Sequence, residues 1–238
     1  LVLYKRSVER GLDQPPSGKM RVVSGPGILV AAITMSIAAI DWLMSLDPHW
    51  FSTMFGVIVI VGNLLSAMCF VVALTIVARH AAGGEMEKDP LHDLGNLMLV
   101  FVMLWAYVSY SQYLIIYAGN MSEDVIWYAH RAEGGWETMA IVLIALHFAL
   151  PFVLLISRRT KRNARSLVAI ACLVLVMRLV EGFWTIAPNF YGHHLHVHWM
   201  DLAAPLGIGG IWLAYFFHRF GRKELEPVPE LVRHGKEA

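Results

Sequence analysis

Apolar residues are concentrated in six long runs, which short polar segments separate. Each run approaches the roughly 20 residues that a helix needs to cross a bilayer. The runs cover residues 28–46, 54–77, 97–117, 136–157, 166–187 and 200–217. The pattern predicts an all-α fold, a polytopic membrane helix bundle with six transmembrane helices over residues 28–217. Residues 1–27 and 218–238 are the predicted N-terminal segment and C-terminal tail.

The basic residues predict the orientation of the bundle. Cytoplasmic loops of membrane proteins carry an excess of Lys and Arg. Of the 19 Lys and Arg residues, all but Arg131 and Arg178 fall in the N-terminal segment, the second and fourth loops between spans, or the tail. Both termini are therefore predicted to be cytoplasmic, and the first, third and fifth loops to face outward. The opening LVLYKRS has the pattern of a helix end, which predicts the C-terminal portion of a longer protein.

Composition excludes an ordinary soluble domain. Hydrophobic residues make up 57% of the chain, charged residues 16%, and the mean hydropathy is +0.56. Soluble domains contain about 25% charged residues. Membrane lipid is therefore the expected surrounding, and no nucleic-acid partner is expected. The two cysteines form no haem-attachment motif and no iron–sulfur set, so no covalently bound cofactor is predicted.

Three charged residues lie inside the predicted spans. Each costs at least about 2.5–3.5 kcal/mol there, and such residues usually serve a function or pair with another charge. They are Asp41, Arg178 and Glu181. At 1.5 Å per residue, Asp41 lies roughly 9 Å and Glu181 roughly 10 Å inside the predicted outer surface. Uncharged polar residues at similar or greater depth are Gln112, Asn63 and His147. These depths predict a polar seam between the helices.

Asp41 and Glu181 are predicted to transfer protons. Two carboxylates near Arg178 leave either a net charge or a bound proton, which suits a proton-handling group. The structural alternative is a buried ion pair between Arg178 and Glu181 or Asp41. Asp47 and His49, just beyond the first span, are predicted to connect Asp41 with the outer side.

The histidines allow two interpretations each. His147 is either a weak proton-transfer candidate or a packed, hydrogen-bonded core residue. Pro151 cannot donate to the carbonyl of His147, which predicts a kink in the fourth span.

The fifth loop contains four histidines that could bind a transition metal or simply lie in a solvated loop. They are His193, His194, His196 and His198. No Cys or acid of matching spacing accompanies them, so no dedicated metal site is predicted.

Tryptophans and helix starts complete the predicted topology. Four tryptophans on the predicted outer side indicate an aromatic belt at the membrane interface. They are Trp50, Trp127, Trp136 and Trp199. Ser122 is the predicted N-cap of a short interfacial helix, and Asp89 that of the helix containing the third span.

Three motifs carry a resemblance to a known family. They are DWLMSLDPHWFSTMFG at 41–56, LHDLG at 91–95 and SQYLIIYAGN at 111–120. With them the chain resembles, over about residues 28–217, the ActF-type membrane subunit of bacterial alternative complex III, a quinol:cytochrome c oxidoreductase. This subunit is similar to the NrfD-like, polysulfide-reductase membrane-anchor family. Family members have about ten spans, so the chain resembles their C-terminal portion.

The resemblance implies a place in a respiratory complex of the bacterial cytoplasmic membrane. The implied partners are a paralogous quinol-binding membrane subunit, c-type cytochrome subunits and an iron–sulfur subunit. Haem c and the iron–sulfur clusters would lie on these partners, and menaquinol or ubiquinol would be the substrate. Asp41, Asp47 and His49 lie within the first motif and carry over from the family. The roles of Arg178 and Glu181 depend on their depth alone.

Two alternatives remain at this stage. The chain could be a structural scaffold of such a complex, whose acids only pair with Arg178. It could also be a proton-coupled secondary transporter, because intramembrane acids and an interrupted span such as APLGIGG at 204–210 are compatible with one.

Overall fold

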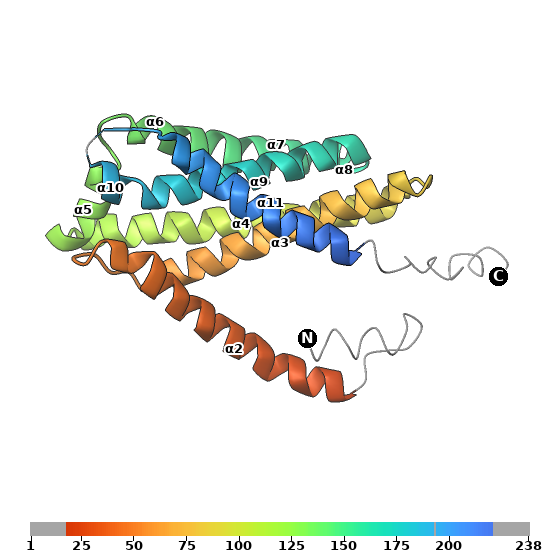
Figure 1. The fold of residues 1–238 in the computed structure, drawn as a ribbon, viewed down its shortest axis with the longest axis horizontal. Coiled ribbons are helices and arrows are strands. Elements are labelled where there is room, and N and C mark those ends of the chain that lie inside the picture. Colours follow the sequence, from red (N-terminus) through yellow and green to blue (C-terminus); the bar gives the residue numbers. More distant parts are fainter. Residues whose placement is uncertain (1–17, 193, 221–238) are drawn as a thin grey trace. The chain divides into compact units, whose positions relative to one another are not determined.

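The computed structural model describes residues 18–192 and 194–220, and every regular element in these ranges is helical (Figure 1). The first half contains α2 (Gly18–Trp42), η1 (Met44–Leu46), α3 (Phe55–Ala81), α4 (Lys88–Gly119) and α5 (Ser122–His130). The second half contains α6 (Trp136–Val142), the π-helical η2 (Leu143–Ala149), α7 (Leu150–Ile156), α8 (Arg158–Lys161), α9 (Ala164–Ile186), α10 (Pro188–Tyr191) and α11 (Trp199–Phe220).

Within these ranges, six segments are long and apolar enough to cross a membrane. They are Val22–Leu46, Phe55–Ala81, Lys88–Gly119, Trp136–Ile156, Ala164–Tyr191 and Trp199–Arg219. Each contains or closely matches one predicted span, so the prediction of an all-α, multi-pass membrane protein is confirmed. The third helix begins nine residues before the predicted span, since residues 88–96 are helical but too polar to join the apolar run.

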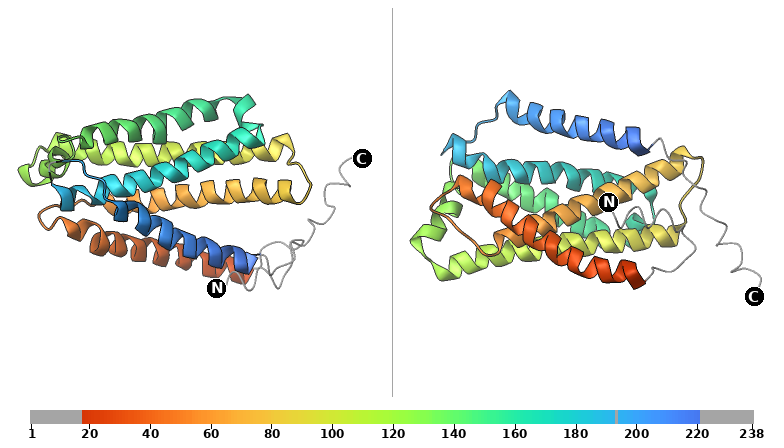
Figure 2. Two further views of the ribbon diagram at one scale, coloured as in Figure 1. Left: turned by 45° about the horizontal axis from the view of Figure 1, so that its top comes forward. Right: turned by 60° about the horizontal axis from the view of Figure 1, so that its bottom comes forward.

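The chain divides into two compact units, Leu1–Leu195 and His196–Ala238. The core of the first unit lies where α3 packs against α4 and α9. Side chains fully shielded from solvent come from all three helices: Leu65, Cys69 and Val72 from α3, Met98 and Val102 from α4, and Leu167 and Val174 from α9. The antiparallel arrangement of α3 and α4 is visible in Figure 2. A continuous apolar contact surface therefore holds the functional side chains between these helices.

One end of the first unit, here called the Asp47 end, contains the loops after η1 and α4 together with α5 and α10 (Figure 1). Close approach of α2 to α3 occurs there, because a Cβ atom at Gly56 would lie 3.2 Å from Ser36 Cβ. Trp50 is 4% exposed and stacks on Trp127 with ring centroids 4.8 Å apart. Trp50 and Phe55 of the first motif therefore belong to a packed cluster with Trp127 at this end.

The predicted aromatic belt is wrong for three of its four tryptophans. Trp50, Trp127 and Trp136 are buried, while Trp199 of α11 is exposed. The indole nitrogen of Trp136 donates to the carbonyl of Gly192 across 3.2 Å. These rings are covered by neighbouring helices and loops of the chain, so they stabilise the fold and do not face lipid.

Both predicted caps are also wrong. The N-cap of α4 is Glu87 and that of α5 is Met121, and neither makes a side-chain capping bond. Asp89 instead pairs with Arg162 just after α8, across 3.0 Å. A tertiary ion pair has replaced the local capping bond, which sequence spacing alone could not indicate.

The opposite end of the first unit is fixed by a buried lysine. Lys161 of α8 is 5% exposed, and its Nζ donates to Asn96 Oδ1 of α4 across 2.5 Å. A Cβ atom at Gly95 would lie 2.6 Å from Lys161 Cγ, so only glycine leaves room for the lysine stem. The contact ties the segment before α9 to the first turns of α4.

In the second unit, α11 is a continuous helix. Pro205 lies inside it, and the glycines of APLGIGG do not interrupt it. At its start, Asp201 Oδ2 accepts a hydrogen bond from the backbone amide of His198 across 2.8 Å. The predicted interruption at 204–210 is therefore wrong.

Candidate functional site

Arg178 and Glu181 of α9 form a partly buried ion pair in the middle of the first unit. Nη1 of Arg178 donates to Oε2 of Glu181, and the two residues are one helical turn apart. Their side chains are only 16% and 12% exposed. Glu181 is thus the partner of Arg178, and the alternative pairing of Arg178 with Asp41 is not formed.

The guanidinium of Arg178 lies against α3. Its Nε donates to Ser66 Oγ across 3.3 Å, and Ser66 Oγ donates in turn to the carbonyl of Gly62 across 3.0 Å. A Cβ atom at Gly62 would clash with the guanidinium group. Gly62 therefore provides the space that the guanidinium occupies, while the hydrogen bonds to Ser66 and Glu181 orient it.

Two aromatic rings surround the carboxylate of Glu181. The indole nitrogen of Trp105 on α4 donates to Oε1 across 3.1 Å. His147 of η2 is fully buried, with its Nε2 3.9 Å from Oε2 and its ring 4.1 Å from that of Trp105, centroid to centroid. Neither ring nitrogen of His147 makes a hydrogen bond within the described ranges. The carboxylate is held from two sides, and a buried imidazole lies just beyond hydrogen-bonding distance.

His147 lies in π-helical backbone, and Pro151 follows four residues later. Proline removes one amide donor from the helix, and a π-turn is one way in which a helix accommodates such a break. The backbone at this position of the fourth span is thus π-helical, and the predicted kink stays a prediction. The π-helical segment places His147 against α4 and α9, where α6 and η2 also contact α9.

A cavity of about 870 Å³ opens beside Glu181. Helices α3, α4, α5, α6, η2 and α9 all contribute to its wall, which is mainly apolar and aromatic. Exposed tyrosines of α4 line part of it, with Tyr107 69% and Tyr110 62% exposed. Ligand sites commonly have volumes of about 300–1,000 Å³ and combine apolar walls with a few polar groups. Glu181 and Trp105 are such polar groups here.

A second polar group lies toward the Asp47 end of the same cavity. Gln112 of α4 is 2% exposed; its Oε1 accepts from Ser52 Oγ across 3.3 Å and its Nε2 donates to Tyr128 Oη across 3.5 Å. Burial raises the pKa of Tyr128 to about 12, against the opposing effects of Gln112 and Arg131. The phenol is therefore neutral at physiological pH and can both donate and accept a hydrogen bond.

Arg131 also lines the large cavity, where backbone carbonyls of α5 and α9 bind its guanidinium. Its guanidinium donates to the carbonyls of Trp127, Thr185 and Trp184 across 2.9, 2.7 and 3.3 Å, and it lies 3.7 Å from the Trp127 ring centroid. Burial lowers its pKa to about 10, while the charge of Asp47 opposes the shift. Arg131 remains charged at neutral pH and joins α5 to the last turn of α9, where helix carbonyls attract a cation.

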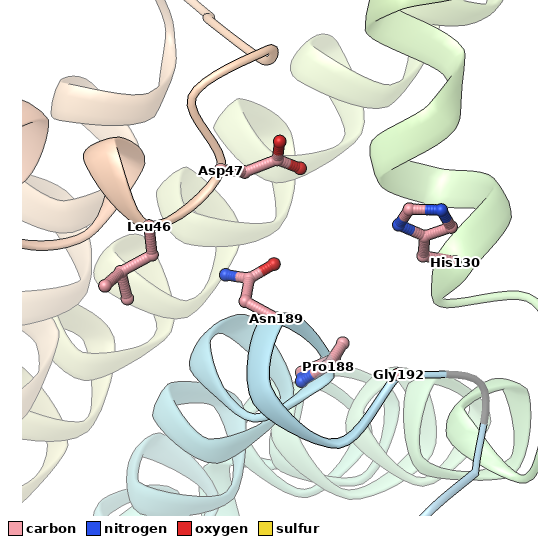
Figure 3. Close-up of a pocket in the computed structure, with 6 residues that line it drawn as sticks. All are labelled: Leu46, Asp47, His130, Pro188, Asn189 and Gly192. Carbon is pink, nitrogen blue, oxygen red and sulfur yellow. The ribbon is translucent and has the colours of Figure 1, made fainter.

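Asp47 lines a different and smaller pocket, of about 240 Å³, at the surface of the Asp47 end. Figure 3 shows its carboxylate facing this pocket together with His130 of α5 and Asn189 of α10. The prediction that Asp47 lies at the end of the helices holds. The negative charge of Asp47 acts on Arg131, which lines the wall of the larger cavity.

The predicted polar seam is only partly formed. Arg178, Glu181 and His147 come together, and Gln112 lines the same cavity as Glu181. Asp41, His49 and Asn63 are exposed, and the side chain of Asp41 makes no hydrogen bond or ion pair with the described part of the chain. Polar side chains at the same depth on different helices did not all come together, because the packing between helices sets how each helix is rotated about its axis.

The histidines of the fifth loop form no described metal site. His193 lies outside the described residues. Among 18–192 and 194–220, no group of three or more His, Cys, Asp or Glu side chains is placed to hold a metal ion. His198 instead helps to start α11, since its Nδ1 accepts from the amide of Met200 across 3.4 Å.

Several residues of the site carry no strong sequence signal. Trp105 and Ser66 appear as ordinary members of apolar helices, and Gly62 as one small residue among many. The four-residue spacing between Gly62 and Ser66 is the one indication that they share a face of α3.

Comparisons with known proteins do not identify a family. No protein-family model matches the chain, and no curated protein matches it at a significant level.

Proposed function

We propose that the chain is a membrane subunit of a quinol-oxidising respiratory complex, and that the cavity beside Glu181 takes the quinol ring. The observation that carries the proposal is the juxtaposition of this carboxylate with an aromatic cavity of about 870 Å³, which opens at the outer surface of the membrane-spanning helices beside the exposed Tyr107 and Tyr110. A quinol is an apolar molecule with two polar hydroxyl groups. An apolar cavity with a few hydrogen-bonding groups suits both parts of it.

The chemistry requires a proton acceptor near the ring. Oxidation of a quinol to a quinone releases two electrons and two protons. Glu181, whose carboxylate is the ion-pair partner of Arg178, accepts one proton when it is ionised. Trp105 holds the carboxylate in place by its hydrogen bond to Oε1. The aromatic walls exclude water and orient the ring.

Glu181 accepts the second proton only after it has passed on the first. His147, with Nε2 3.9 Å from Glu181 Oε2, is positioned to take that first proton through a small movement, and the electrons leave by other groups. The chain has no haem-attachment motif and no iron–sulfur set, so the electrons pass to partner subunits. These are c-type cytochromes and an iron–sulfur protein, as the resemblance to the ActF-type subunit implies.

The charge pattern gives the proposed orientation. The Asp47 end faces the outside of the bacterial cytoplasmic membrane, and both termini lie in the cytoplasm, because Lys and Arg are concentrated in the opposite loops. Protons from the quinol would then be released outward, past Gln112 and Tyr128 toward Asp47.

A structural role in the same complex is the second candidate. The observation that favours it is the direct contact of Arg178 with Glu181, which already neutralises both charges. The double variant Arg178→Gln/Glu181→Gln discriminates between the two. A scaffold assembles and supports wild-type quinol oxidation with both charges removed, whereas a proton acceptor cannot be replaced by an amide.

The proposal is tested by purifying the tagged chain from its native membrane in mild detergent. The reduced-minus-oxidised visible spectrum is recorded, and the co-purifying chains are identified. Stoichiometric c-type haem together with an iron–sulfur subunit supports the proposal. A colourless protein isolated alone contradicts it.

A further inference from the structure

The turn between α7 and α9 is strongly basic. Five of the eight residues 158–165 are Lys or Arg, and none is acidic. The turn joins the candidate spans Trp136–Ile156 and Ala164–Tyr191, and it lies at the end of the first unit opposite α5 and α10 (Figure 1). Its basic side chains therefore lie within a few residues of the end of a membrane-crossing helix, which is the level of the lipid headgroups.

Two of the five basic residues have a partner within the first unit. Lys161 Nζ donates to Asn96 Oδ1 across 2.5 Å, and Arg162 Nη2 pairs with Asp89 Oδ1 across 3.0 Å. The other three side chains are exposed and form no hydrogen bond or ion pair with residues 18–192 or 194–220. They are Arg158, Arg159 and Arg165, here called the three arginines. The interactions that fix the turn thus leave three cationic groups unused within the described part of the chain.

The acids near the turn do not neutralise the three arginines. Asp93, in the first turns of α4, has its Oδ1 3.8 Å from Nδ1 of His92. Glu85 and Glu87, in the loop before α4, are exposed and form no ion pair within the described ranges. Among these ranges, the ion pair of Arg162 with Asp89 is thus the one that offsets the charge of the turn.

The backbone of the turn is held in place. Asn163 Oδ1 accepts hydrogen bonds from the amides of Arg165 and Ser166, across 3.0 and 3.3 Å. Lys161 is 5% exposed, and its stem fills the space beside Gly95. An anion at this turn would therefore meet guanidinium groups on a fixed backbone, and not the two amides that Asn163 already occupies. A fixed backbone lowers the entropy cost of binding.

An apolar surface lies directly beside these charges. Val153 and Ile156 of α7 are 63% and 56% exposed, and Ile156 is the last residue of that helix. Residues three apart share a helix face, so the two side chains form an apolar strip that ends just before Arg158. Positive charge next to exposed apolar side chains matches a molecule with a negative headgroup and an apolar chain.

We propose that the three arginines bind the phosphate group of an anionic phospholipid, whose acyl chain lies along Val153 and Ile156. The forked guanidinium group matches the geometry of a phosphate. Basic clusters at the end of a membrane helix attract anionic lipids, and the apolar strip favours a lipid over a free phosphate ion. The inference does not depend on the proposed quinol chemistry, since the turn lies outside the cavity beside Glu181.

The test measures the affinity for one lipid. The full chain, with any subunits that accompany it, is purified in detergent, freed of lipid and titrated with phosphatidylglycerol. Native mass spectrometry gives the dissociation constant of the first bound lipid. The test variant is Arg158→Gln/Arg159→Gln/Arg165→Gln. The matched control is Arg79→Gln/Lys88→Gln/Arg219→Gln, which removes the same charge from three exposed residues in other segments.

Each of the three arginines is expected to contribute about fivefold to the affinity, so the test variant binds phosphatidylglycerol about 100-fold more weakly than the wild type. The control variant stays within about threefold of the wild type, because dispersed exposed charges are screened. Zwitterionic phosphatidylcholine binds the wild type more weakly than phosphatidylglycerol. Bound phosphatidylglycerol raises the unfolding temperature of the wild type and the control, but not that of the test variant.

Four results overturn the inference. They are equal losses of affinity in the two triple variants, equal affinity for the two lipids, displacement of the lipid by millimolar inorganic phosphate, and a wild-type complex that binds no phosphatidylglycerol. The third result would indicate a plain anion site, and the fourth a turn covered by another subunit. The three arginines have no described contact to lose, so a lower unfolding temperature of the lipid-free test variant also contradicts the account.

Discussion

The indole nitrogen of Trp105 donates a hydrogen bond to Glu181 Oε1 across 3.1 Å, from one membrane helix to another. Trp105 and Glu181 are 76 residues apart in the chain, and both line the large cavity. With Arg178 on the other carboxylate oxygen, the hydrogen bond leaves Glu181 few orientations. A fixed carboxylate at the wall of an apolar cavity is the feature on which the proposed function depends.

Glu181→Gln is expected to abolish most of the quinol oxidation in the intact complex. The amide keeps the size of the side chain and can still accept the Trp105 hydrogen bond, but it cannot take up a proton. General bases contribute about 10²–10⁴-fold to rate, so the turnover falls by about 10²-fold or more. Steady-state quinol oxidation measures this.

Asp93→Asn is the matched control for Glu181→Gln. Its side chain is 83% exposed in the first turns of α4, and it lies outside the cavity. Its turnover should equal that of the wild type. A Glu181→Gln complex that turns over within about twofold of wild type would show that another group accepts the proton.

Gly62→Ala is expected to destabilise the protein and displace Arg178. A methyl group at residue 62 occupies the space of the guanidinium, and overpacking of this kind costs about 1–3 kcal/mol. Gly182→Ala on α9 is the control, because no atom lies within 4 Å of the added methyl group. Its effect is neutral or stabilising by up to about 1 kcal/mol, from helix propensity. Thermal unfolding in detergent compares the two, and equal unfolding temperatures would contradict the close contact.

Arg131→Met is expected to lower the free energy of unfolding by about 2–4 kcal/mol. It leaves three backbone carbonyls without their donor, and each such loss in a buried site costs about 1–3 kcal/mol, with partial relaxation. Arg131→Lys keeps the charge but not the forked geometry, so it should recover only part of the loss. Arg159→Met, at an exposed position of α8, should be neutral.

The phenol of Tyr128 is expected to lose its proton at a higher pH than that of an ordinary tyrosine. Burial raises its pKa to about 12 from an ordinary value near 10, so its stabilising contribution is complete below pH 10 and is lost as the pH rises toward 12. At pH 11, Tyr128→Phe should therefore leave the phenolate absorbance of the folded protein unchanged. In denaturant the same substitution should lower the absorbance by one tyrosine. A decrease of that size in the folded protein would place Tyr128 in water.

Hydropathy alone predicted the spans, because the cost of exposing polar backbone in lipid leaves few other solutions for a run of about 20 apolar residues. The three-residue spacing of Arg178 and Glu181 indicated that they share a helix face, although Asp41 remained a second possible partner. Local spacing within one helix was sufficient for both conclusions.

The contacts between different helices could not be predicted from spacing within one helix. Gly62 and Gly95 each make room for a basic side chain from a segment far away in the sequence, Arg178 and Lys161 respectively. Nothing in the local sequence distinguishes them from glycines with open space around them, such as Gly182. Asp41 was misplaced for the same reason, as the rotation of a helix about its axis decides which side chains are covered. Trp50 lies in the loop after η1, and its burial depends on how that loop packs against Trp127 of α5.

The most direct test of the central claim is photolabelling of the intact complex with an azido-substituted quinone, followed by identification of the labelled residues. The account predicts labels on residues that line the cavity, such as Tyr110 and Tyr113 of α4 or Ile144 of η2, and loss of these labels when excess quinol is present. Labels confined to other subunits, or to exposed positions away from the cavity such as Val153, would contradict the claim that quinol binds beside Glu181.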